Sequence, residues 1–295
     1  MNLSSKPLSG APGGEPVPTA TYRLQFHRDF TFGQAAAIVE YLRALGISHV
    51  YASPLFQAGP DSTHGYDICR FDQLNPLLGT QADFDRFSAR LRQAGLGLIL
   101  DMVPNHMGND PSNAWWMDVL RHGPASPFAA FFDIDWHPLQ AGFRDQVLLP
   151  ILEDHYFKVL EAGKLRLTAE NGQLTIAYHD RRFPLRPESY GEIANALREA
   201  SGVSAPVTLR GDGTDAAVLL EKACHLYRGE PGQASSFDRL HHLLARQHYR
   251  LAYWRIGPEA INYRRFFDVT QLVGVRMERP DVFEATHRLV FALLQ

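Results

Sequence analysis

The sequence predicts an α/β fold with a parallel sheet. The observation that supports this is that β-prone and amphipathic helical segments alternate between Thr19 and Asp101. The polar residues that directly follow the predicted strands mark where chemistry is expected in such a fold. A strand–helix–strand–helix–strand order is typical of parallel sheets with crossover helices. An open doubly wound sheet and a (β/α)8 barrel both have this order, so the hydrophobic pattern alone does not distinguish them.

The first strand is predicted over Thr19–Phe26 (TATYRLQF), which is β-prone and preceded by Pro18. A helix over residues 35–45 follows, with an apolar stripe at helical spacing formed by Ala35, Ile38, Val39, Leu42 and Leu45. Gly46 is a typical helix stop. Residues 49–52 (HVYA) form the second predicted strand.

A long loop is predicted over residues 53–80, and loops of this length are usually functional. Thr80 then opens a helix, with Asp83 three residues later as in a capping box. After that helix, residues 98–100 form a third strand that leads into Asp101.

After Met107 the pattern changes to an aromatic-rich stretch and a predicted β-hairpin over residues 164–178, because Asn171-Gly172 is a strong turn signal. Helices are predicted near residues 216–226 and 237–247, and again from Asp281, with Pro280 at the helix start. The expected organisation is a flexible leader (1–18), a first α/β part (19–106), an inserted α+β domain (107–268) and a return to the α/β part (269–295).

Composition excludes several classes of function. The net charge is −3, which disfavours nucleic-acid partners. Only two cysteines occur, so a disulfide framework is not expected and a reducing cytoplasm fits best. The sequence shows neither a secretory signal nor an apolar run long enough for a membrane span, so a cytoplasmic protein is predicted.

The most informative motif is Leu98–His106 (LILDMVPNH), which resembles the first conserved region of α-amylase superfamily glycoside hydrolases. Residues 62–67 (STHGYD) resemble the Gly-Tyr-Asp element of the same superfamily. The opening TYRLQF and residues 178–190 and 240–268 resemble maltooligosyltrehalose synthases in particular. This resemblance runs almost continuously from Thr19 to Gln295.

The resemblance implies a (β/α)8 barrel, here a partial one: three strands, then a large α+β insertion after strand three. It also implies the glucosylmutase reaction, in which the reducing-end α-1,4 link of a maltooligosaccharide becomes an α,α-1,1 trehalose end. The family's nucleophilic Asp and acid Glu follow strands four and five and are expected beyond Gln295. The chain alone is therefore expected to be inactive, and no catalytic residue is assigned to it.

The resemblance also implies one wall of a sugar pocket. Tyr66 is expected to stack under a glucose ring and His106 to donate to a hydroxyl of the same sugar. Asp101 and Asp67 are expected to pair with downstream arginines, and without them to be solvated. The remaining candidate contacts to glucan are His64, Gln25, Asn105, Arg264 and Arg265.

Several alternatives stay open. Asn105 occupies a position that binds calcium in many amylases, but no metal and no cofactor are expected here. His64 is predicted either to order its own loop or to touch sugar. The rival functions are another glucanotransferase or hydrolase of the superfamily, and a non-catalytic glucan-binding fragment. Self-association through an open edge of the third strand is also expected.

Overall fold

The computed structural model describes residues 17–139, 144–202, 209 and 214–294. The chain forms two compact units: residues 1–103 with 286–295, and residues 104–285. The predicted leader (1–18) lies almost wholly outside the described residues. The predicted division into four parts stays a prediction.

The first unit contains a parallel three-stranded sheet in the order β1-β2-β5. Its strands are β1 (Thr21–Leu24), β2 (His49–Ala52) and β5 (Gly97–Leu100). The register places Arg23 opposite Tyr51, and Tyr51 opposite Ile99. The predicted parallel sheet is therefore confirmed. The sheets formed by the described residues are open, with no closed barrel among them.

Three helices connect these strands: α1 (Phe32–Ala37), α2 (Val39–Ala44) and α3 (Gln81–Gln93). The single helix predicted over residues 35–45 is divided at Ile38, whose φ of −98° and ψ of 5° depart from helical values. The predicted start of α3 is confirmed. The Thr80 hydroxyl accepts from the Asp83 backbone N–H at 3.2 Å, and the Asp83 carboxylate accepts from the Thr80 N–H at 2.9 Å.

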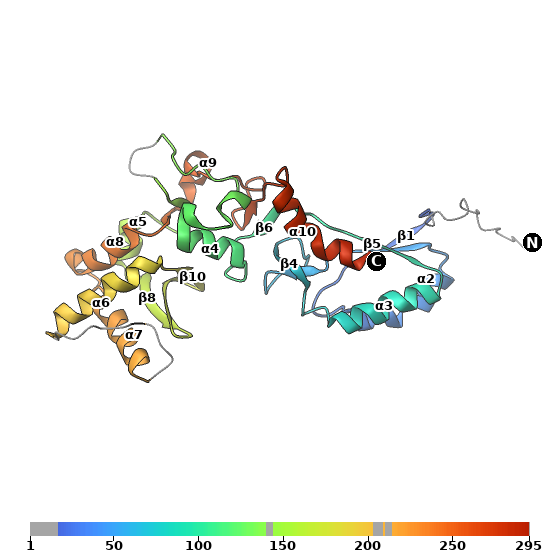
Figure 1. The fold of residues 1–295 in the computed structure, drawn as a ribbon, viewed down its shortest axis with the longest axis horizontal. Helices are drawn as coiled ribbons and strands as arrows, with labels where there is room; N and C mark the ends of the chain where they lie inside the picture. The colour runs from blue at the N-terminus through green and yellow to red at the C-terminus, as the bar shows by residue number, and fades with distance from the viewer. Residues whose placement is uncertain (1–16, 140–143, 203–208, 210–213, 295) are drawn as a thin grey trace, which may run out of the picture. The chain divides into compact units, whose positions relative to one another are not determined.

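The helices α1, α2 and α3 cover one face of this sheet (Figure 1). Because side chains alternate along a strand, the apolar residues of the strands point to that face. Leu24 and Val50 are buried there in one core with Phe87. Arg23 and Tyr51 project from the opposite face, which leaves that face free for polar chemistry.

The segment 53–80 is not the structureless loop that the sequence predicts. It contains an antiparallel pair, β3 (Phe56–Ala58) and β4 (Ile68–Leu74). The pairing is irregular around Gln57, and β4 buries Ile68, Cys69 and Phe71 without strict alternation. Such a strand lacks the period-two pattern by which strands are usually predicted.

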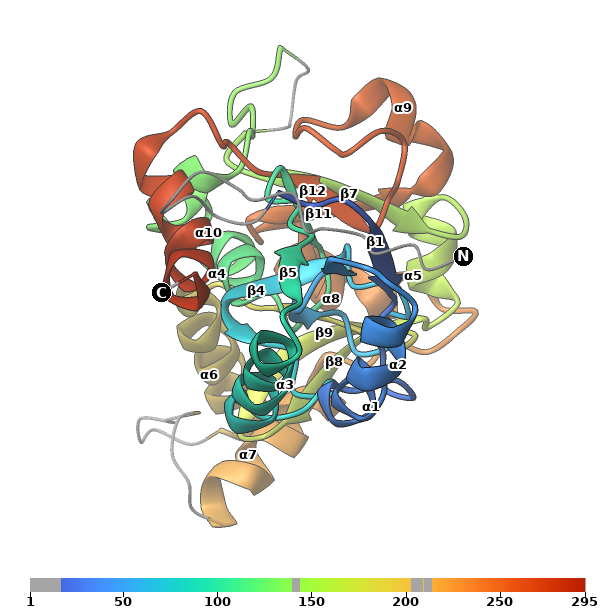
Figure 2. The same cartoon turned by 90° about the vertical axis from the view of Figure 1, so that its right-hand side faces the viewer.

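In the second unit the predicted hairpin is confirmed as β8 (Leu165–Glu170) and β9 (Gln173–Tyr178), which lie side by side (Figure 2). Asn171 and Gly172 have φ of 51° and 72°, as a two-residue turn of this kind requires. A third strand, β10 (Arg181–Pro184), extends the sheet.

Two further strand pairs belong to this unit. A parallel pair joins β7 (Val147–Leu152) to β11 (Tyr249–Tyr253), and an antiparallel pair joins β6 (His106–Gly108) to β12 (Leu272–Gly274).

Helices make up most of the remaining regular structure. They are α4 (Ala114–His122), α5 (Tyr156–Glu161), α6 (Pro187–Ser201), α7 (Thr214–Leu226), α8 (Asp238–Ala245), α9 (Gly257–Ala260) and α10 (Pro280–Leu293), with short 3-10 turns at η1 (Gly123–Ala125), η2 (Ala129–Phe131), η3 (Ala234–Phe237) and η4 (Trp254–Ile256). The helices predicted near residues 216–226, 237–247 and 281 are confirmed as α7, α8 and α10. In the part of the chain that the structure describes, none of the helices is long and apolar enough to cross a membrane.

Candidate functional site

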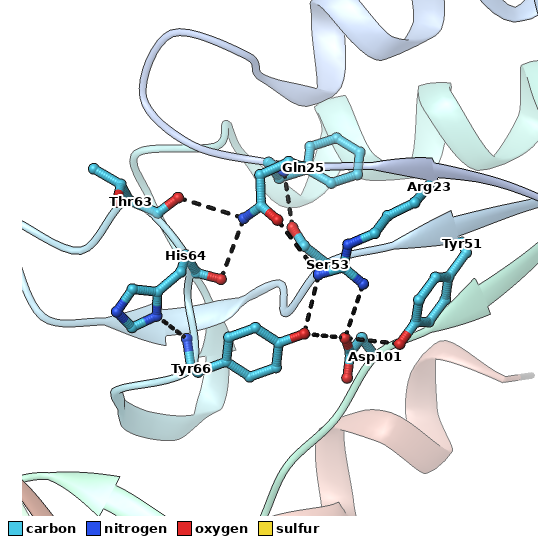
Figure 3. A network of polar contacts seen from close by, with 9 residues as sticks. Arg23, Gln25, Tyr51, Ser53, Thr63, His64, Tyr66 and Asp101 are labelled. Carbon is cyan, nitrogen blue, oxygen red and sulfur yellow. Dashed lines mark hydrogen bonds and ion pairs between the residues drawn. The ribbon is translucent and has the colours of Figure 1, made fainter. Parts of the chain in front are cut away.

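A polar network surrounds Asp101, the residue that directly follows β5. Its Oδ2 accepts hydrogen bonds from the hydroxyls of Tyr51 at 2.9 Å and Tyr66 at 2.5 Å, and from Arg23 Nη1 at 3.1 Å (Figure 3). The Asp101 side chain is only 10% exposed. A carboxylate with this little access to water needs such donors to remain charged.

The strands bring these donors together. Arg23 on β1 and Tyr51 on β2 are partners in the parallel register and so project from the same face of the sheet. The Arg23 guanidinium lies over the Tyr51 ring, 4.8 Å from its centroid, in a cation–π contact. Tyr66 reaches the same carboxylate from the turn between β3 and β4.

The contacts of the network determine the charges of its members. Burial by itself raises the pKa of Asp101, but the hydrogen bonds from Tyr66, Tyr51 and Arg23 outweigh it and lower this pKa below its ordinary value. Burial and the bond to Asp101 raise the pKa of Tyr66, while the bond to Asp101 is the main cause of the raised pKa of Tyr51. At neutral pH the carboxylate is therefore charged and both phenols are protonated.

Gln25 links this network to the turn that carries Tyr66. Its Oε1 accepts from Arg23 Nη2 at 3.3 Å, and its Nε2 donates to the backbone oxygens of Thr63 at 3.4 Å and His64 at 3.3 Å. His64 Nδ1 accepts from the backbone N–H of Tyr66 at 3.0 Å, and the two rings stack with centroids 6.0 Å apart. These contacts lie within the loop of His64, and both roles predicted for it, loop ordering and sugar contact, stay predictions.

Asp67 is held within the same turn. Its carboxylate accepts a hydrogen bond from the Ser62 hydroxyl and lies 3.8 Å from His64 Nδ1. A Cβ at Gly59 would stand 2.8 Å from Asp67 Oδ2, so a side chain at this position would displace the Asp67 carboxylate. The expectation that Asp67 and Asp101 are solvated without downstream arginines is wrong, because their side chains are 25% and 10% exposed and both have partners within this turn and sheet.

Asn105 and His106 belong to the second unit. His106 is only 2% exposed, its ring stacks on Phe266 with centroids 4.2 Å apart, and its Nδ1 lies 2.7 Å from Asn105 Oδ1. The sequence did not predict the Phe266 contact. Tyr66 belongs to the first unit, so the expected meeting of Tyr66 and His106 at one glucose stays a prediction.

Arg264 and Arg265 both have structural contacts in the second unit. Arg264 bonds Asp133 through Nε at 3.2 Å and the backbone oxygen of Val275 through Nη2 at 3.0 Å. The Arg265 side chain is 5% exposed and pairs with Asp268 at 3.7 Å. Its Nε has no hydrogen-bond partner within the described residues. A role for either arginine in binding glucan stays a prediction.

Three residues of the network around Asp101 were missed as individual candidates. Arg23 and Tyr51 bind Asp101, and the Ser53 hydroxyl accepts from the Phe26 N–H at 2.8 Å, which ties the end of β1 to the end of β2. The available signal was strand alternation: Arg23 precedes the core residue Leu24 and so must face away from the helices.

No group of three or more His, Cys, Asp or Glu side chains in the described part of the chain has the geometry of a metal site.

Comparison with known proteins agrees with the motifs. The α-amylase catalytic domain family matches residues 35–157. A candidate maltooligosyl trehalose synthase of Mycobacterium tuberculosis is 36% identical over 275 residues, which is 91% of this chain and 28% of that protein. The solved maltooligosyltrehalose synthase of Arthrobacter ramosus has a TM-score of 0.69 at 32% identity, over 92% of this chain and 29% of that one.

A second solved maltooligosyl trehalose synthase has a TM-score of 0.69 at 28% identity, over 94% of this chain and 30% of that one. The chain thus spans less than a third of the length of these relatives. The continuous similarity shows that the chain is maltooligosyl trehalose synthase-like, and residues 35–157 match part of an α-amylase catalytic domain.

Proposed function

We propose that this chain forms part of the glucan-binding wall of a maltooligosyltrehalose synthase, with maltooligosaccharides as substrate. The observation that carries the proposal is the network in which Asp101 and Arg23 hold the Tyr66 hydroxyl beside the end of a parallel sheet. Enzyme sites on parallel sheets form at the carboxyl ends of the strands, where Asp101 and Tyr66 meet.

The proposed reaction is a retaining transglycosylation inside one sugar chain. A carboxylate attacks the anomeric carbon of the penultimate glucose, while an acid donates its proton to the O4 of the terminal glucose as the α-1,4 bond breaks. The anomeric hydroxyl of the freed glucose then attacks the same carbon, gives its proton to the carboxylate left by the acid, and releases the nucleophile. The product has an α,α-1,1 link. We assign neither carboxylate to a residue of this chain.

The chain's proposed part is to grip the sugar before bond cleavage. The Tyr66 ring offers an aromatic face to the apolar C–H face of glucose. Asp101 uses only its Oδ2 for the contacts described above, which leaves Oδ1 as an acceptor for the downstream arginine that the family resemblance implies. His106 is only 2% exposed, so its proposed contact with a sugar hydroxyl requires the surrounding side chains to open. The further proposed contacts are Gln25, His64, Asp67, Asn105, Arg264 and Arg265.

Removal of the Tyr66 ring tests the binding role directly. In an NMR titration with maltopentaose we expect the unmodified chain to bind and Tyr66→Ala to bind up to about tenfold more weakly, because a stacked aromatic face is worth up to roughly 1.4 kcal/mol. Tyr41→Ala is the matched control, since Tyr41 is 59% exposed on α2. Equal affinity of Tyr66→Ala and the unmodified chain would refute the proposed wall.

Product analysis separates the synthase from its rivals. A polypeptide with the complete reaction converts maltopentaose to a non-reducing product without release of glucose, whereas a hydrolase or a 4-α-glucanotransferase of the same superfamily gives shorter or longer reducing chains. For these 295 residues alone we expect binding without turnover. Formation of maltooligosyltrehalose by the purified chain would show that a nucleophile and an acid lie within it.

A further inference from the structure

We infer that Arg23 is the positioning residue of this site: it fixes the Tyr66 ring for the sugar through the phenol hydroxyl and the shared Asp101 carboxylate. This inference rests on the proposed function, in which Tyr66 is the stacking platform. Arg23 lies on the first strand and touches no reacting atom in the proposed reaction, so it acts through Tyr66 and is not itself catalytic.

The geometry is a closed triangle of three side chains (Figure 3). Arg23 Nη1 donates to Asp101 at 3.1 Å, Arg23 Nη2 donates to the Tyr66 hydroxyl at 3.0 Å, and that hydroxyl donates to Asp101 at 2.5 Å. The Tyr66 oxygen thus has one donor and one acceptor in fixed directions. Two such bonds fix both the position of the hydroxyl and the direction of the ring axis.

A second set of contacts fixes Arg23 itself. Its guanidinium lies over the Tyr51 ring, 4.8 Å from the centroid, and Nη2 also donates to Gln25 at 3.3 Å. Gln25 in turn bonds the backbone oxygens of Thr63 and His64, next to Tyr66 in the same turn. Arg23 therefore contacts Tyr66 directly at the ring hydroxyl. Through Gln25 it also contacts the backbone of the turn that carries Tyr66.

The charge of Arg23 is as important as its shape. Arg23 is the cation in the ion pair of Asp101, whose side chain is 10% exposed. Without this cation the charged carboxylate, the stronger acceptor for the Tyr66 hydroxyl, is stabilised less, because only the hydroxyls of Tyr66 and Tyr51 then offset its burial. A lysine would restore the charge but not the two-pronged contact, because an ammonium is a point charge on a flexible stem.

The organisation of Tyr66 is therefore built from residues of this unit and precedes any contact with a downstream arginine. A platform that is already ordered does not lose conformational freedom when sugar binds. The first strand, whose TYRLQF segment resembles the synthases, thus has a role in sugar affinity through Arg23.

The first test is independent of sugar. With 13C-labelled tyrosine, we expect Arg23→Met to shift the ring resonance of Tyr66 and Arg23→Lys to shift it less. Arg43→Met is the matched control, since Arg43 on α2 makes an exposed pair with Glu40 at 3.5 Å and should leave Tyr66 unchanged. An unchanged Tyr66 resonance in folded Arg23→Met overturns the inference. If Arg23→Met does not fold, the same measurement is made on Arg23→Lys, and an unchanged Tyr66 resonance in that variant overturns the inference.

The second test is a double-mutant cycle read by maltopentaose affinity. We expect Arg23→Met to weaken binding about tenfold and to make Tyr66→Phe almost neutral when the two are combined, because Arg23 acts through the Tyr66 hydroxyl. Additive losses would overturn the inference. Absence of binding by the unmodified chain would refute the proposed function, and the resonance test would still decide the role of Arg23.

Discussion

At the scale of single residues, the charged carboxylate of Asp101 holds the donors of the site together. Removal of this charge should lower the free energy of unfolding. Asp101→Asn keeps the shape but leaves Arg23 without its counter-ion and replaces one acceptor by an amide donor next to two hydroxyls. At pH 7 we expect a loss of about 1–3 kcal/mol in the free energy of unfolding, the usual cost of a buried group left unsatisfied. Urea unfolding measures this loss.

The dependence on pH follows from the lowered pKa of Asp101 in the folded protein. A lowered folded-state pKa means that the stabilisation is present above the unfolded-state pKa of about 3.9 and is lost as the pH falls through the folded-state value. The difference between the unmodified chain and Asp101→Asn should therefore shrink below about pH 4. Asp61→Asn, at a side chain that is 102% exposed, should show neither effect. A constant difference from pH 7 to pH 3 would contradict the assignment.

Single site residues were predictable where the motif is local. Tyr66 and Asp101 each lie in a short recognisable segment, and a hydrogen bond joins the two segments in the structure. The role of Arg23 depends on a partner that lies far along the chain and on the strand register, which local pattern does not reveal. The burial of His106 under Phe266 is of the same kind, because the ring comes from a distant segment of the second unit.

At the scale of elements, local signals predicted best. The capping box at Thr80 and Asp83 and the turn at Asn171-Gly172 involve neighbours in sequence, so the start of α3 and the β8–β9 hairpin were foreseen. The β3–β4 pair was not. Its irregular register near Gln57 hides the alternation that marks a strand.

The Thr80 cap offers a test at this scale. Thr80→Ala removes the side-chain acceptor of the Asp83 N–H and the hydroxyl that donates to Asp83 at 2.7 Å. We expect a loss of about 1 kcal/mol in the free energy of unfolding, within the range measured for N-cap replacements. Gln93→Ala, at an exposed position in the last turn of the same helix, should change stability by less than about half as much. Equal effects at both positions would mean that the cap does not stabilise α3.

At the scale of the whole chain, the parallel sheet was predictable from alternation, and the choice of a barrel came only from resemblance. The described strands β1, β2 and β5 agree with part of an α-amylase catalytic domain and form an open sheet. The relatives with which the chain aligns are about three times as long. The similarity therefore covers only part of each relative, and the complete reaction stays a proposal for this chain.

The open edge of this sheet leads to the last prediction. In the order β1-β2-β5, β5 pairs with β2 on one side only among the described residues, so its other edge carries backbone donors and acceptors that can pair with another chain. We expect concentration-dependent self-association in sedimentation velocity. Ile99→Lys should reduce it, because a charged residue on an edge strand opposes pairing. Leu45→Lys, which replaces another apolar residue, 52% exposed at the end of α2, should leave it unchanged. A monomer at every concentration, with a single cooperative thermal transition, would show that this edge is covered.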